Sequence, residues 1–195
     1  HRDHDGNGLC EYGCSDGTLE AARWESGMDN AVRFDASRLL QNGDKAWSLD
    51  QESVDLNAYL CAEKRCLASL ADAIDRRDEA AAWRREADRL QRALADRFFD
   101  PAAGYFRDRR LGDGGFVAAD GAEGWIPLWA GAASPEQAAV VARALADPGR
   151  FATRVPFPSL SAGQPGFDPA GGYWRGPVWL DQAGFALEGL NRYGF

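Results

Sequence analysis

Hydrophobic positions recur at helical spacing through the middle of the chain. After Asp55, apolar side chains fall on one face of a helix, namely Leu60, Leu67, Leu70 and Ile74. A second run repeats at steps of three and four, at Trp83, Ala87, Leu90, Leu94 and Phe98. Its opposite face is dense in charged residues, as expected for a face in water. The pattern predicts two consecutive amphipathic helices.

Three further helices are predicted toward the C-terminus. The apolar segment 123–133 indicates a short buried helix interrupted by Pro127. Ser134, Pro135 and Gln137 have the spacing of a capped helix start, and that helix ends near residue 147. A last helix begins near Pro177, with an apolar stripe at Trp179, Ala183, Ala186 and Leu190.

The remaining segments lack a helical period. Residues 1–20 are rich in Asp, Gly and Asn and predict a loop, and 98–111 predict a turn with short strands around it. Residues 149–172 are rich in Pro and Gly and predict a long loop, which in compact domains is often functional. No alternation of strand and helix patterns is evident. The prediction is therefore an all-α protein of helical hairpins joined by long, aromatic-rich loops.

Composition narrows the class of function. The chain has 195 residues, a formal charge of -8 and a pI near 4.8, which disfavours nucleic acid or an anionic membrane as the partner. No run approaches the roughly 20 apolar residues of a membrane span. Seven Trp, five Tyr and ten Phe suit either a large core or a platform for sugar rings. The four cysteines form no C-x-x-C pair, which disfavours zinc. Cys10 and Cys14 are either a disulfide or free thiols.

The N-terminal loop carries oxygen ligands at alternate positions. Asp3, Asp5 and Asn7 precede Gly8, and Glu11 follows. Such ligands wrap around Ca²⁺, although the twelfth position of an EF-hand pattern is Cys14 here, where a Glu is needed. A calcium site would need a carboxylate from elsewhere. The alternative is a surface loop of Asx turns without a metal.

The stretch "WESGMDN", residues 24–30, holds a candidate general acid. Such an acid needs a raised pKa, and burial against Trp24 and the nearby Glu25 carboxylate would both raise that of Asp29. The alternative is a turn in which Asp29 caps the following helix.

A second aromatic cluster lies at a predicted junction between loop and helix. It consists of Tyr173, Trp174, Arg175 and Trp179. These residue types line sugar pockets. Alternatively, the tryptophans fill the core and Arg175 caps a neighbouring element.

These segments, in this order, resemble glycoside hydrolase family 63, which contains processing α-glucosidase I and bacterial α-glucosidases. The matching pieces span nearly the whole chain: "DHDGNGLCEYG", "WESGMDN", "LDQESVDLNAYL", "EGWIPLWAGAAS" and "YWRGPVWLDQAGFALEGLNRYG". The resemblance implies that residues 1–195 are a single fragment of an (α/α)6 toroid, truncated at both ends. It also implies a periplasmic or secreted location, although the sequence is equally compatible with a cytoplasmic one.

The resemblance further implies an inverting, exo-acting α-glucosidase that hydrolyses oligosaccharides or disaccharides. Asp29 would protonate the leaving oxygen and Glu25 would orient or tune it. The family's general base falls in a later segment, so this chain alone is expected to be inactive. The connector from Asp29 to Gln51 is shorter than in bacterial members of the family, which predicts different substrate loops and a different leaving-group preference.

The same resemblance completes the calcium site. The implied ligands are Asp3, Asp5, Asn7, the Leu9 carbonyl, Glu11 and Glu52, and the last of these is the missing carboxylate. The ion would be structural.

Three other functions are compatible with the sequence. A trehalase-like enzyme or a hydrolase of mannosylglycerate or glucosylglycerate would have the same fold. An inactive carbohydrate-binding relative would keep Trp174 and Trp179 but need no acid. A purely structural module of helical hairpins would use its apolar patches to contact other proteins.

Overall fold

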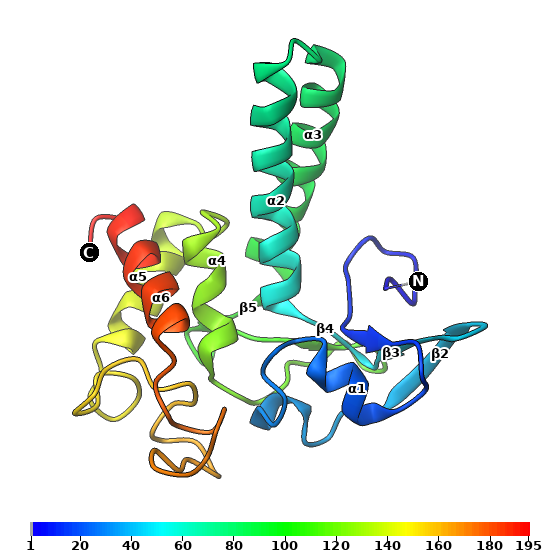
Figure 1. Ribbon diagram of the computed structural model, residues 1–195. Helices are drawn as coiled ribbons and strands as arrows, with labels where there is room; N and C mark the ends of the chain where they lie inside the picture. The colour runs from blue at the N-terminus through cyan, green and yellow to red at the C-terminus, as the bar shows by residue number, and fades with distance from the viewer. Residues whose placement is uncertain (1) are drawn as a thin grey trace.

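The structure, a computed structural model, describes residues 2–195 and confirms the two predicted central helices. Helices α2 (Val54–Ala73) and α3 (Arg77–Ala93) form an antiparallel hairpin that projects from the rest of the molecule (Figure 1). A π-helical turn, Leu94–Phe98, continues α3 into the body. Among residues 2–195 no helix is both long and apolar enough to cross a membrane.

One detail of the predicted α2 face is wrong. Leu70 and Ile74 are 63% and 66% exposed, although they continue the apolar pattern of the helix. Near its C-terminus α2 buries Ala68 and Ala71 instead. This end of α2 lies in the projecting part of the hairpin, where small residues let the two helices approach closely (Figure 1).

The C-terminal helices lie beside the base of the hairpin, on the side away from the N-terminal segment (Figure 1). A 3₁₀ turn (Ala122–Trp125) leads into the short buried helix α4 (Ile126–Trp129), which packs against α6 (Leu180–Arg192). Helix α5 (Pro135–Leu145) begins with the predicted capping box. The Ser134 hydroxyl accepts from the Gln137 amide at 3.2 Å, and the Ser134 amide donates to the Gln137 side chain at 3.0 Å.

Near the N-terminus the structure contains a sheet that the sequence analysis missed. Strands β1 (Gly13–Cys14), β2 (Leu39–Gly43) and β3 (Ala46–Leu49) form an antiparallel sheet in the order β1-β3-β2. Helix α1 (Leu19–Trp24) packs beside it, followed by a 3₁₀ turn, Val32–Phe34. The loop predicted for residues 1–20 is therefore wrong in part, because strand β1 and the start of α1 fall within it. The short connector between Asp29 and Gln51 is this β2–β3 hairpin.

Two small strand pairs lie below the helical hairpin. Strand β4 (Gln51–Glu52) pairs with β7 (Arg109–Arg110), and β5 (Phe99–Asp100) pairs with β6 (Tyr105–Phe106). Strands β5, β6 and β7 confirm the short strands and the turn predicted for residues 98–111. Strand β4 brings Glu52 next to the N-terminal loop at the start of α2.

The aromatic core lies between these strand pairs and the C-terminal helices. Tyr105 stacks on Phe151 with ring centroids 5.3 Å apart, and Trp125 meets Phe151 edge-on at 5.5 Å. Gly124 is required beside them, because a Cβ there would collide with the Tyr105 ring. Many of the aromatic residues therefore serve the core.

The cysteines are free thiols. Cys14 and Cys61 are buried, Cys10 is half-buried and Cys66 is exposed. The Cys14 thiol lies 3.2 Å from the Thr18 carbonyl oxygen, at the start of α1. Of the two possibilities for Cys10 and Cys14, the structure contains the unpaired one.

Candidate active site

Asp29 lies in the turn that follows helix α1. The Thr18 hydroxyl caps α1 by accepting from the Ala21 amide at 3.2 Å. Beyond the helix Gly27 adopts a φ of +73°, which a residue with a side chain rarely adopts. The turn leaves Asp29 half-buried. The following 3₁₀ turn is preceded by Ala31 and has no side-chain cap, so Asp29 does not cap it.

A cavity of about 420 Å³ opens beside Asp29. Its lining mixes carboxylates, guanidinium groups and an indole. The residues are Leu19, Glu20, Arg23, Trp24, Asp29, Asn30, Ala31, Asp35 and Arg175. The predicted residues Trp24, Asp29 and Arg175 therefore share one polar hollow, although 146 positions separate Asp29 from Arg175.

The aromatic cluster lies next to Asp29. The Tyr173 hydroxyl is 3.4 Å from Oδ2 of Asp29, to which it can donate a hydrogen bond. Trp174 and Trp179 stack face to face with centroids 4.1 Å apart, and Tyr173 meets Trp179 edge-on at 5.3 Å. Trp174 is buried and supports the stack, whereas Tyr173 is 46% exposed. Trp174 therefore fills the core, as the alternative interpretation has it, whereas the role of the exposed Tyr173 in a sugar pocket stays a prediction.

Arg175 has protein partners on both sides. Its Nε donates to the Asn30 carbonyl at 2.7 Å and its Nη2 to Asp35 at 2.5 Å. It therefore ties the aromatic segment to the segment that carries Asp29, while still lining the cavity.

Trp24 and Glu25 differ from what their spacing suggested. Trp24 is 56% exposed and lines the cavity rather than burying Asp29. The Glu25 carboxylate accepts from Arg2 at 2.6 Å and from the Gly13 amide at 2.6 Å. Glu25 thus uses its carboxylate to link α1 to the N-terminal loop and β1, rather than to orient Asp29.

A buried ion cluster, which the sequence analysis did not find, is centred on Arg33, shortly after the turn that carries Asp29. The Arg33 guanidinium donates to both oxygens of Asp55, at 2.8 and 2.7 Å, and contacts Asp108 at 3.3 Å. Asp108 also accepts from the Gln51 side chain and the Val54 amide, each at 2.8 Å. Burial disfavours the charged guanidinium, but Asp55 and Asp108 outweigh it and hold the pKa of Arg33 above its ordinary value. The cluster joins the turn after Asp29 to the start of α2.

Glu123, in the 3₁₀ turn before α4, is also a buried acid. Burial raises its pKa to about 8, with nearby Arg33 acting in the opposite direction. Its Oε1 accepts from the Gly121 amide at 3.1 Å. The segment "EGWIPLW" gave no sign of this titration, because it depends on packing around the carboxyl group.

The pKa of Glu123 predicts a pH dependence of stability. In the folded protein the Glu123 carboxyl keeps its proton up to about pH 8. In the unfolded chain the same carboxyl loses its proton near pH 4.5, its ordinary pKa. The folded state therefore binds more protons over this window, and its stability falls as pH rises, by at most about 1.4 kcal/mol per pH unit. Glu123→Gln should remove this contribution. Urea unfolding at pH 5 and pH 8 measures it, and an equal pH dependence in both proteins would contradict the assignment.

The predicted metal ligands partly gather in the N-terminal loop. One carboxylate oxygen from each of Asp3, Asp5 and Glu11 lies within 4.8 Å of the others. Oδ1 of Asp3 and Oε1 of Glu11 are buried without a hydrogen-bond partner. Burial raises the pKa of Glu11 to about 8, and nearby Asp3, Asp5 and Glu52 add to the rise, while a hydrogen bond from the His4 amide opposes it. Unpaired buried oxygens of this kind fit a hard cation.

The other predicted ligands lie beside this group and have partners. Oε1 of Glu52 accepts from the Asn7 side chain at 2.5 Å and from Arg97 at 3.1 Å. The side-chain oxygen of Asn7 accepts from the Leu9 amide at 2.8 Å. Glu52 thus contacts the loop through Asn7, and its role as a calcium ligand stays a prediction. The Leu9 carbonyl stays a predicted ligand.

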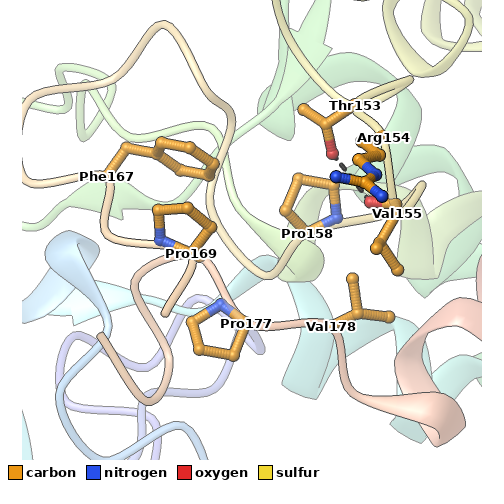
Figure 2. A pocket seen from close by; sticks show the side chains of 9 residues that line it. Thr153, Arg154, Val155, Pro158, Phe167, Pro169, Pro177 and Val178 are labelled. Atoms are coloured by element: carbon orange, nitrogen blue, oxygen red, sulfur yellow. Dashed lines mark hydrogen bonds between the residues drawn. The ribbon is translucent and has the colours of Figure 1, made fainter. Parts of the chain in front are cut away.

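A second hollow of about 420 Å³ lies under the long loop (Figure 2). Its walls are mostly apolar and proline-rich, and they share no residue with the cavity at Asp29. They are Thr153, Arg154, Val155, Pro158, Phe167, Pro169, Gly176, Pro177 and Val178. Because no carboxylate lines it, this hollow lacks the groups needed for acid catalysis.

Comparison with known proteins gives consistent matches. Over residues 1–194 the chain matches the family described as "Mannosylglycerate hydrolase MGH1-like glycoside hydrolase domain". It is 43% identical over 102 residues, 51% of its own length, to "Mannosylglycerate hydrolase MGH1" of Selaginella moellendorffii. It is 29% identical over 147 residues, 74% of its length, to "Mannosylglycerate hydrolase" of Rubrobacter radiotolerans.

Similar solved structures include members of the same group of enzymes. The chain resembles the GH63 mannosylglycerate hydrolase from Thermus thermophilus in complex with glucose, with a TM-score of 0.78 and 26% identity, over 100% of this chain and 52% of that one. The similar structures are (α/α)6 glycosidases, which confirms the predicted fold class, with short strands added. The chain spans 20% and 33% of the two curated relatives.

Proposed function

The chain belongs to the MGH1-like group of glycoside hydrolase family 63, and we propose that it carries the general acid of an inverting enzyme acting on an α-linked glycoside. The observation that carries the proposal is Asp29, half-buried in a polar cavity, with the Tyr173 hydroxyl 3.4 Å from its carboxylate. Trp179 meets Tyr173 edge-on and is backed by the buried Trp174, so the exposed Tyr173 ring stands on a rigid aromatic support of the kind found beside sugar rings.

In this proposal protonated Asp29 gives its proton to the glycosidic oxygen as the bond to the anomeric carbon breaks. A water molecule attacks that carbon from the opposite face, and a base carboxylate takes the water's proton. In inverting enzymes the two carboxyl groups are about 6.5–9.5 Å apart, which leaves room for this water. We assign no base among the described residues. Glu188, the last glutamate, accepts instead from the Trp129 indole at 2.9 Å.

For the substrate we propose a glycosylglycerate, with mannosylglycerate first. The curated relatives carry that activity in their names, and this supports the glycosylglycerate alternative over an oligosaccharide α-glucosidase. The α-glucosidase remains the second candidate, because one similar structure is described as a complex with glucose.

A substrate panel tests this proposal on the full-length protein. The panel holds mannosylglycerate, glucosylglycerate, trehalose, and α-1,2- and α-1,3-linked glucose disaccharides, and released sugar is measured. We expect the highest kcat/KM on a glycosylglycerate. A preference for the disaccharides would favour the α-glucosidase. Sugar binding without turnover of any member would favour the inactive carbohydrate-binding relative.

We further propose that Asp3, Asp5 and Glu11 hold a calcium ion, with Asn7, the Leu9 carbonyl and Glu52 beside them. The buried, unpartnered oxygens of Asp3 and Glu11 support it. Bound there, the ion would supply positive charge to a cluster of carboxylates and so fix the N-terminal loop. Glu52 lies at the start of α2, so the loop would be fixed to the helical hairpin.

Removal of calcium should lower the thermal stability. An ion at a hundred times its dissociation constant stabilises by about 2.7 kcal/mol, equivalent to about 5–10 °C in Tm for a domain of about 150–250 residues and to a smaller shift in a longer chain. The measurement is a thermal melt of the full-length protein in calcium and in chelator. The matched control is Asp3→Asn, which should melt at one temperature in both buffers. An unchanged wild-type Tm would count against the ion.

A further inference from the structure

Asn30, the residue after Asp29, holds the main chain on both sides of Tyr173. Its side-chain nitrogen donates to the Gly172 carbonyl at 3.1 Å. Its side-chain oxygen accepts from the Trp174 amide at 3.0 Å. One carboxamide thus satisfies an acceptor and a donor that flank Tyr173, although more than 140 positions separate them in the sequence.

Tyr173 needs such support because its backbone is strained. Its φ is +60°, a conformation in which a bulky residue is an outlier. The Trp179 indole adds a third restraint by donating to the Tyr173 carbonyl at 3.0 Å. Strain of this kind persists where the surroundings over-determine it. Here the two hydrogen bonds from Asn30 act beside the main-chain bond from the Arg175 amide to the Gly172 carbonyl at 3.0 Å.

The result of the strain is the position of the phenol. With this backbone the Tyr173 hydroxyl lies 3.4 Å from Oδ2 of Asp29. Asn30 also accepts at its own carbonyl from Arg175 at 2.7 Å, so the main chain directly after Asp29 is fixed as well. A single residue therefore contacts both the segment that carries the acid and the segment that carries the hydroxyl facing it.

We propose that Asn30 is a positioning residue, which fixes Tyr173 against Asp29 and thereby aims the Asp29 proton at the leaving oxygen. This inference rests on the proposed function, since it concerns how Asp29 acts. Asn30 need not touch the substrate for this role. Its loss should leave Trp174 and Trp179 stacked and change proton delivery.

Two substrates with different leaving groups separate this role from a structural one. Cleavage of mannosylglycerate needs a proton on the leaving oxygen, whereas fluoride leaves an α-mannosyl fluoride with little help from an acid. In the full-length protein, Asn30→Ala should lower kcat on mannosylglycerate by about 30- to 100-fold, the scale of loss from a misplaced group. On the fluoride the loss should be less than about threefold. Asn191→Ala, at an exposed position on α6, is the matched control and should change neither rate.

Hydrogen exchange tests the restraint itself without catalysis. The Trp174 amide loses its acceptor in Asn30→Ala, so exchange in the peptide 172–176 should become at least about tenfold faster, and unchanged exchange would overturn the inference. Equal losses on the two substrates would also overturn it, because they would mean general damage to the site. A wild type that cleaves neither substrate would overturn the proposed function, whereas an active wild type with equal losses overturns only the role of Asn30.

Discussion

Asp29→Asn should lower kcat/KM on the preferred glycoside by about 10³-fold or more, because the amide has no proton to give to the leaving oxygen. Loss of a general acid typically costs about 10²–10⁴-fold. The fold should be unaffected, since the amide oxygen can still accept from the Tyr173 hydroxyl that now faces Oδ2. The measurement is kcat/KM of the full-length wild type and variant, with the Tm of each recorded as a check on folding.

The control for this result is Asp44→Asn, the same change in the exposed turn of the β2–β3 hairpin. It should retain wild-type activity. A similar kcat/KM for Asp29→Asn and the wild type would return Asp29 to a structural role in the turn after α1.

Arg33→Met should destabilise the protein by about 3–5 kcal/mol, the usual loss when one partner of a buried ion cluster is removed. The Asp55 and Asp108 carboxylates would remain buried and would lose their shared cation. Methionine fills much of the space but offers no donor in place of the contacts at 2.8, 2.7 and 3.3 Å. Denaturant unfolding of wild type and variant measures the difference.

Arg76→Met provides the comparison, because Arg76 makes an exposed ion pair with Glu79 at 2.7 Å. Exposed pairs contribute about 0–1 kcal/mol, so this variant should unfold close to the wild type. A loss below about 1 kcal/mol for Arg33→Met would show that the cluster around Asp55 does not hold the turn after Asp29 to the start of α2.

The helices were predictable because their signals are local. Apolar spacing located α2, α3 and α6, and the Ser134–Gln137 capping box marked the start of α5 within a few residues. The β1-β3-β2 sheet was not predictable, since β1 has two residues and pairs with a strand more than 30 positions away. The exposure of Leu70 and Ile74 was missed because periodicity cannot show how far a hairpin projects from the body.

The same holds for the candidate site, where residues in local motifs were predicted and contacts between distant residues were not. Asp29, Trp24 and the Tyr173–Trp179 cluster stand in short recognisable stretches, and the structure brings them together around one cavity or next to it. The sequence of these stretches did not show which distant groups their side chains contact. The choice of Arg2 and Gly13 by Glu25, and the meeting of Arg33 with Asp55 and Asp108, depend on contacts across 12 to 75 positions.

The central claim is that Asp29 is the general acid of an inverting α-glycoside hydrolase. Proton NMR of the sugar released in the first minutes of reaction by the full-length protein tests it most directly, with mannosylglycerate as substrate and Asp29→Asn alongside. The account predicts that the β-anomer appears first from the wild type and that the variant releases almost none. Release of the α-anomer first, or equal release by both chains, would contradict it.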